Sequence, residues 1–179
     1  LTLRDVVKQR PTSEVYTLLI NAFLQKGQAA EERGNKAEAS ENFDKAIAVI
    51  NDARKTDPAN EELLGTMINL YLRMNRAGEA KPHIYEALAK DPTNKIYQYD
   101  LGVLLMQTDS LTEAIPHFEA ALKVDPKYDL ALQNTAITYM KLGDKTRKAT
   151  QGSDPKKSAD KSFIEHFKKA AAYFERLIE

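Results

Sequence analysis

The stretch AKDPTN, Ala89–Asn94, decides how this sequence is divided, because its Asp-Pro pair recurs at a constant interval. The same pair stands in KTDPAN, Lys55–Asn60, and in KVDPKY, Lys123–Tyr128, so that the prolines fall at positions 58, 92 and 126. A fixed interval within the range of roughly 20–50 residues indicates an internal structural repeat. Proline lacks a backbone N–H and clashes with the preceding helical turn, so each pair predicts the end of a helix. The aspartate is expected to cap the helix that follows.

Small residues keep the same interval within each repeat. Ala80 and Ala114 are separated by the same distance along the sequence as Pro92 and Pro126, and so are Ala87 and Ala121. The segments DLGVLLMQ and EAIPHFEAAL carry apolar residues at helical spacing. Each unit is therefore predicted to form a helix, a tight turn and a second helix.

Turn residues mark the middle of each unit. Asn75 and Asp109 are predicted to form the turn between the two helices, and Gly143 continues this series at the same interval. Ser110 followed by Glu113 predicts a capping box for the helix after the second of these turns.

The repeats resemble the tetratricopeptide repeat family, and the resemblance covers most of the chain from about Ile20. Ile68 stands where the family has Gly or Ala, which predicts a looser helix approach there. The resemblance implies an all-α fold, a right-handed superhelical solenoid of about four repeats, with first helices lining a concave face. The matching residues are Leu101, Gly102, Leu105, Ala114, Phe118, Ala121 and Pro126 in the third unit, and Met67, Ile68, Tyr71, Ala80, Ile84, Ala87 and Pro92 in the second.

Two units depart from the common length. Ala39 and Ala80 are separated by seven residues more than the common interval, which predicts about two additional helical turns in both helices of the first hairpin. In the last unit, Ala170, Phe174 and Leu177 are assigned to the second helix, after a polar insert. The predicted divisions are an N-terminal extension at 1–12 and a repeat domain at 13–179, with units 13–60, 61–94, 95–128 and 129–179 and an inserted loop at 145–161.

Composition argues against several classes of function. The chain has 26 basic and 26 acidic residues, so it lacks the positive excess of proteins that neutralise many phosphates. It contains no cysteine and no apolar run of about 18 residues, which excludes thiolate sites and predicts no membrane span. His83 and His117 occupy equivalent positions and are interpreted as packing residues rather than metal ligands. With no phosphate-binding loop, nucleophile elbow or zinc motif, we expect no enzyme, cofactor, metal or nucleic acid.

The resemblance also implies which residues face a partner. Positions on the first helices are polar in the first unit and apolar in the third and fourth. Leu72, Met106 and Met140 recur on this face at the interval of the repeat, and methionine adapts well to varied partners. The predicted partner-binding residues are Asn69, Leu72, Arg73, Ile96, Tyr99, Val103, Met106, Leu130, Asn134, Ile137 and Met140.

These residues predict a non-catalytic adaptor that binds another protein, as an apolar peptide or a partner's helix, in the groove. The alternative is architectural, namely a segment of a longer solenoid or a self-associating subunit whose groove is filled by its own chain or a second copy. A clamp for a chaperone's terminal carboxylate is rejected, because Leu24, Gln28, Thr66 and Asp100 stand at its positions. A start at Leu1 and the lack of cysteine favour a bacterial cell-envelope protein.

Overall fold

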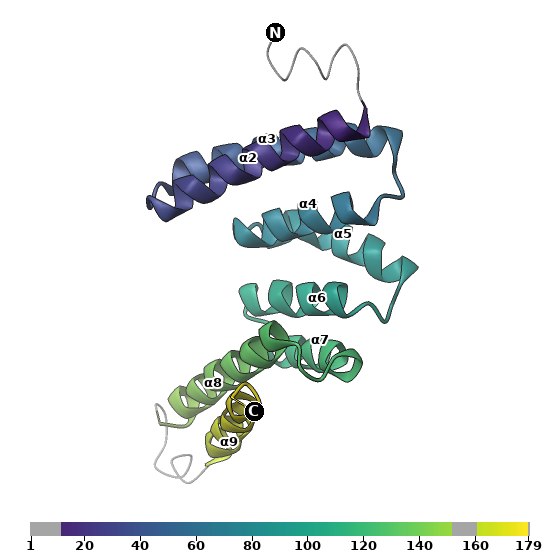
Figure 1. The fold of residues 1–179 in the computed structure, drawn as a ribbon. Helices are drawn as coiled ribbons and strands as arrows, with labels where there is room; N and C mark the ends of the chain where they lie inside the picture. Colours follow the sequence, from purple (N-terminus) through teal and green to yellow (C-terminus); the bar gives the residue numbers. More distant parts are fainter. Residues whose placement is uncertain (1–11, 152–160, 179) are drawn as a thin grey trace. The chain divides into compact units, whose positions relative to one another are not determined.

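The computed structural model describes residues 12–151 and 161–178, and within these ranges every regular element is an α-helix. The all-α prediction is therefore confirmed, and the fold class is a solenoid of helical repeats (Figure 1). The helices are α2 (Ser13–Glu32), α3 (Lys36–Thr56), α4 (Glu61–Arg73), α5 (Ala77–Lys90), α6 (Lys95–Gln107), α7 (Leu111–Val124), α8 (Asp129–Gln151) and α9 (Ser162–Glu175).

The chain divides into two compact units after Arg76. Unit 1 contains α2, α3 and α4, and unit 2 contains α5 to α9. The division falls inside the predicted repeat 61–94. Of the predicted extension at 1–12, residues 1–11 lie outside the described residues, and Thr12 is the N-cap of α2.

The turns inside the hairpins confirm the prediction for Asn75 and Asp109. Their φ angles are 57° and 60°, and Gly34 has a φ of 74° in the first hairpin. Asn and Asp tolerate this left-handed conformation better than most residues. The N–H of Arg76 donates to the carbonyl of Tyr71 at 2.8 Å, which closes the Schellman motif that ends α4.

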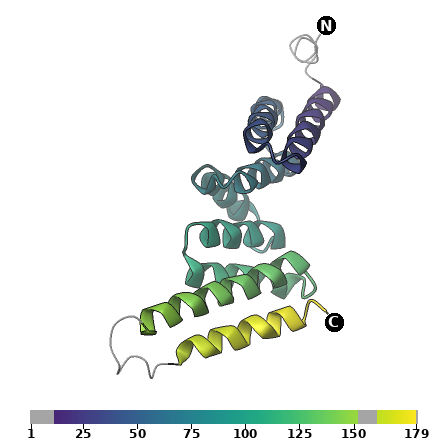
Figure 2. The same cartoon turned by 90° about the vertical axis from the view of Figure 1, so that its left-hand side faces the viewer.

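Gly143, in contrast, does not form a turn. The prediction that the first helix of the last unit ends here and that a loop begins at residue 145 is wrong, because α8 continues to Gln151. A Cβ atom on Gly143 would lie 2.9 Å from Cε1 of Phe167, so this glycine permits the close packing of α9 on α8. Figure 2 shows the two helices next to each other. The rest of the predicted loop, residues 152–160, lies outside the described residues.

The Asp-Pro pairs end helices as predicted, but the capping prediction for the aspartates is wrong. Asp57 is the C-cap of α3, and Asn60, three residues later, is the N-cap of α4, its side chain accepting from the N–H of Leu63 at 3.0 Å. Asn94 caps α6 in the same way. Two residues after the aspartate are needed to reverse the chain, so the fourth residue of the turn becomes the cap.

The capping box predicted at Ser110 and Glu113 is not formed either. Ser110 is the N-cap of α7, but its side chain makes no capping hydrogen bond. Its ψ angle is 55°, outside the extended region that directs a cap side chain at the helix. A backbone hydrogen bond forms at the helix start instead, from the N–H of Glu113 to the carbonyl of Ser110 at 3.1 Å.

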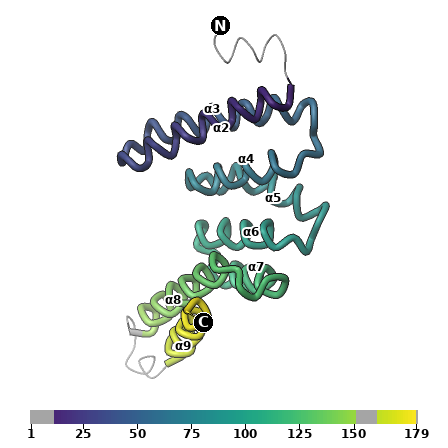
Figure 3. Tube along the Cα trace, viewed as in Figure 1, coloured from purple at the N-terminus to yellow at the C-terminus, as the bar shows by residue number. Residues whose placement is uncertain are grey.

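The predicted extension of the first hairpin is confirmed. The helices α2 and α3 have 20 and 21 residues, whereas α4 and α6 have 13 and α5 and α7 have 14. The helices α2 and α3 pack along each other, as the tube in Figure 3 shows. Tyr16 and Leu19 are buried at the added turns, so the extra length of each helix covers the other.

The helices of a hairpin meet where a glycine faces a phenylalanine. A Cβ atom on Gly27 would lie 2.2 Å from the ring of Phe43, and one on Gly102 would lie 2.6 Å from Phe118. Both rings are fully buried. Since no methyl group fits between these helices, the glycines set the distance at which the hairpins close.

In the last unit the packing differs from the sequence assignment. Ala170 is buried as expected, but Phe174 is 37% exposed. Tyr173 packs in its place against Tyr139, with ring centroids 5.9 Å apart. Leu177 is partly buried against the core of unit 2. Phe174 therefore does not take the buried place that Phe118 has in α7.

Two helical glycines should respond to alanine with opposite sign. Gly102→Ala should destabilise the protein by about 1–2 kcal/mol, because overpacking against Phe118 exceeds the gain in helix propensity. Gly78→Ala should stabilise it by about 0.5–1 kcal/mol, since nothing lies within 4 Å of its added methyl group. Urea unfolding followed by circular dichroism measures both changes. Equal effects of the two substitutions would contradict the close-approach role of Gly102.

Candidate protein-interaction surfaces

The first helices of the last two repeats, α6 and α8, adjoin within unit 2. The Asn134 side chain donates a hydrogen bond to the Tyr99 hydroxyl at 2.8 Å. The Thr138 hydroxyl lies 3.4 Å from the sulfur of Met106. Three predicted partner-binding residues, Tyr99, Asn134 and Met106, are therefore joined into one surface.

This surface, which we call the apolar face, carries the exposed large apolar side chains of α6 and α8. Ile96 is 51% exposed, Leu130 is 50% exposed and Met140 is 43% exposed. Large apolar side chains gathered on a surface are typical of interaction sites. The apolar face consists of Ile96, Tyr99, Val103 and Met106 on α6 and Leu130, Asn134, Ile137 and Met140 on α8, with Val103, Met106, Asn134 and Ile137 half-buried.

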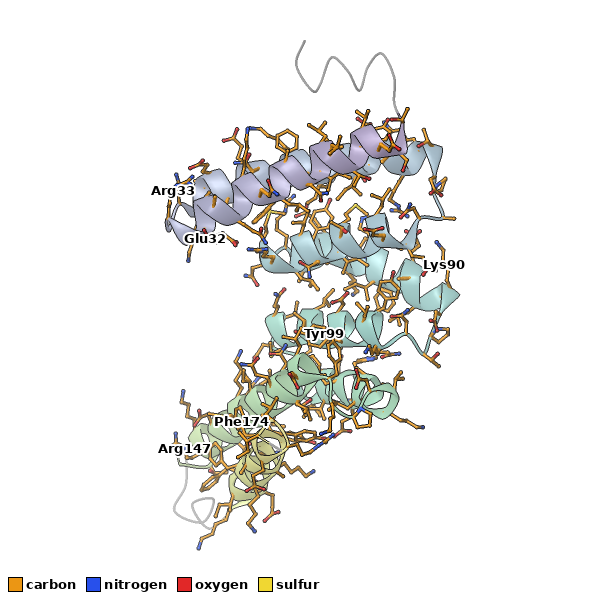
Figure 4. All side chains as sticks on the ribbon, in the orientation of Figure 1. Glu32, Arg33, Lys90, Tyr99, Arg147 and Phe174 are labelled. Carbon is orange, nitrogen blue, oxygen red and sulfur yellow. The ribbon has the colours of Figure 1, made fainter. Side chains whose placement is uncertain are left out.

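Tyr99 forms the floor of the apolar face rather than projecting from it. Its ring centroid lies 5.3 Å from that of Tyr128 and 5.8 Å from that of Phe118. Burial raises the pKa of its hydroxyl to about 12, so the group stays neutral. Figure 4 labels Tyr99 on α6. Truncating this side chain would remove core packing, so it is a poor choice for testing binding alone.

Asp100 lies beneath the same face and was not recognised as a buried charge from the sequence. It is 6% exposed and shares a helical face with Ile96 and Val103, which stand four residues before and three after it. Burial raises the pKa of its carboxyl group to about 7. The signal available in the sequence was a single acidic residue between apolar positions of a first helix.

The other three predicted partner-binding residues belong to unit 1. Leu72 is buried, at 7% exposure, and so contributes little surface. Asn69 is exposed. The guanidinium group of Arg73 forms an ion pair with Glu31 of α2, its Nε donating at 2.9 Å, and lies 5.0 Å from the centroid of the Phe43 ring.

Unit 1 contains a hollow along the first helices α2 and α4, and we call it the polar groove. The part near the start of α4 is lined by Asn21, Leu24, Asp57, Glu62 and Thr66, among others. The part towards the end of α4 shares Leu24 and Thr66 and adds Gln28, Gly65, Asn69 and Arg73. Small side chains on α4 leave the space, which depends on helix packing and not on a sequence motif.

Metal and membrane signatures are lacking in the described part of the chain. Residues 12–151 and 161–178 contain no group of three or more His, Cys, Asp or Glu side chains arranged to hold a metal ion. Nδ1 of His117 lies 2.8 Å from the side-chain oxygen of Gln98. Among the described helices, none combines the length and the apolar character that a membrane span requires.

The geometry defines a helical-repeat protein with exposed surfaces on its first helices. Comparison with family models gives the same class, because tetratricopeptide repeat models match residues 66–146 and residues 20–52. The chain belongs to the tetratricopeptide repeat family. None of the curated proteins compared with the chain matches it.

Solved structures with the same fold include several of MamA. One, described as the crystal structure of MamA, has a TM-score of 0.58 at 17% identity and covers 97% of this chain and 85% of its own. MamA 41-end from Desulfovibrio magneticus RS-1 has a TM-score of 0.57 at 16% identity, covering 97% and 91%. At these identities the similarity establishes the fold alone.

Asp100 predicts an unusual dependence of stability on pH. The folded pKa of about 7 lies above the ordinary value of 3.8, so between these values the folded protein holds a proton that the unfolded chain releases. The unfolding free energy therefore falls as pH rises through this window and the loss is complete above about pH 7. Asp100→Asn removes this loss, so its stabilising effect should be about 2–3 kcal/mol larger near pH 8 than near pH 5.

Urea unfolding of the natural protein and the variant at the two pH values measures this difference. Asp129→Asn at the exposed start of α8 is the matched control for the same change of side chain at a position that is not buried. A stabilising effect of Asp100→Asn that is the same at both pH values would show that the buried carboxyl group titrates normally.

Proposed function

We propose that the chain is a non-catalytic interaction scaffold whose apolar face takes an apolar peptide or a partner's helix. The proposal rests on the exposure of Ile96, Leu130 and Met140 on two adjoining helices of one unit. Exposed apolar area of this kind gains free energy when a partner removes it from water. Membership of the tetratricopeptide repeat family supports a role in protein interactions.

The shape of the apolar face suits a partner that also contributes polar contacts. The side-chain oxygen of Asn134 accepts no hydrogen bond from a described residue, while its amide group donates to Tyr99. The half-buried sulfur of Met106 and the exposed side chain of Met140 can adjust to different apolar side chains. A partner helix would place apolar residues at intervals of three and four on this surface, because such spacing matches a single helical face.

A second candidate function is architectural, and α9 favours it. Phe174 and Ile178 are 37% and 88% exposed, yet they occupy the positions that correspond to Phe118 and Leu122 of the preceding repeat, which are buried at 0% and 6%. In that repeat, Leu122 packs with residues of the next helix, α8. A helix that packs on α9 as α8 packs on α7 would cover Phe174 and Ile178. Such a helix could come from a longer solenoid or from a second copy.

The apolar face is tested by a double substitution that keeps the fold. Ile96→Gln with Leu130→Gln should weaken binding of the partner about tenfold or more, because these two side chains have the largest exposed fractions on the apolar face. Leu18→Gln is the matched control, since Leu18 is 64% exposed but lies on α2. Binding is measured by calorimetry on purified components, with circular dichroism to establish folding.

Two results would contradict the proposal. One is that the double substitution leaves the affinity for the partner unchanged while Leu18→Gln lowers it. The other is a stable dimer in sedimentation equilibrium that dissociates on Phe174→Gln, which would support the architectural role instead.

A further inference from the structure

We propose that the polar groove of unit 1 is a second binding site, which takes an extended peptide segment bearing a lysine or arginine. This site lies on helices other than those of the apolar face and has a different chemical character. It therefore does not depend on the function proposed for α6 and α8.

Unused amide groups provide the first argument. Asn21 and Gln28 on α2 and Asn69 on α4 are exposed, and their side chains make no hydrogen bond to any described residue. Each carboxamide offers both a donor and an acceptor, which is what the backbone of an extended peptide needs. Asn21 and Gln28 are separated by two helical turns, about 10 Å, close to the length of three extended residues.

Charge provides the second argument. Asp57 and Glu62 line the groove near the start of α4, and neither forms an ion pair with a described residue. The carboxylate of Asp57 accepts one hydrogen bond, from the side chain of Asn60 at 3.1 Å. At the far end, the charge of Arg73 is already matched by Glu31. The groove is thus negative at the end near Asp57, where a cationic side chain gains Coulomb energy and a carboxylate loses it.

The floor of the groove supports a close approach of a peptide backbone. Gly65 has no side chain, and the hydroxyl of Thr66 is turned back to donate to the carbonyl of Glu62 at 2.8 Å. Leu24 lines both parts of the groove and offers one apolar contact between the polar groups. The expected segment is therefore extended, carries its basic residue at the end near Glu62 and places one apolar side chain on Leu24.

The test uses the full chain and a fluorescent nonapeptide. The peptide has two adjacent lysines at one end, one central leucine and otherwise serine and threonine. The peptide is made with the lysines at either end, because its direction in the groove is not specified. A matched peptide carries glutamates in place of the lysines. Anisotropy measures affinity, and nitrogen-15 NMR follows the side-chain amide signals of Asn21, Gln28 and Asn69.

We expect the lysine peptide to bind and to shift these three amide signals. Glu62→Gln should weaken binding about fivefold, because one exposed charge pair is lost. Gln28→Leu should weaken it by a similar factor without changing its dependence on salt. Glu41→Gln, on the exposed surface of α3 away from the groove, should leave the affinity unchanged.

Any of three results would overturn the proposal. The first is equal affinity for the glutamate and lysine peptides, and the second is a loss on Glu41→Gln as large as that on Glu62→Gln. The third is no binding of either lysine peptide at about 1 mM, a concentration at which even weak docking is visible. Because no variant alters α6 or α8, failure here is distinguishable from failure of the apolar face.

Discussion

The close contact between a glycine and a phenylalanine inside each of three hairpins is the constraint on which the described packing depends. In the two hairpins with Gly27 and Gly102, the missing side chain lets an aromatic ring lie against the partner helix. The fourth repeat uses the same device with different spacing, since Gly143 faces Phe167. In the second repeat, Ile68 and Ile84 stand at the corresponding positions, and both are fully buried.

This packing explains why the outer surfaces are free to differ. Because the hairpins are closed by small residues and rings in their interior, the exposed positions of the first helices contribute little to folding. Unit 1 uses them for amides and carboxylates around the polar groove, whereas unit 2 uses them for Ile96, Leu130 and Met140. Asp100 lies beneath the apolar face, where burial makes the charged form of its carboxyl group unfavourable.

The sequence predicted features that depend on local backbone chemistry and missed those that depend on packing. Asn75 and Asp109 were predictable because few residues accept a positive φ, and the long first hairpin followed from the seven additional residues. The same interval was misleading at Gly143, where the contact with Phe167 decides the role of the glycine. The resemblance to the repeat family implied which residues of the first helices face a partner, but the shape of the polar groove depends on the distance between α2 and α4, which no motif encodes.

The central claim, that the apolar face binds a partner, is tested most directly by a photoreactive phenylalanine analogue at position 130. The residue there is half exposed, so the change should leave the fold intact. The account predicts that light joins this position to a different protein or peptide in cells that make the chain, and that the same analogue at position 18 does not capture it. Cross-links that form only within the chain or between its copies would contradict it.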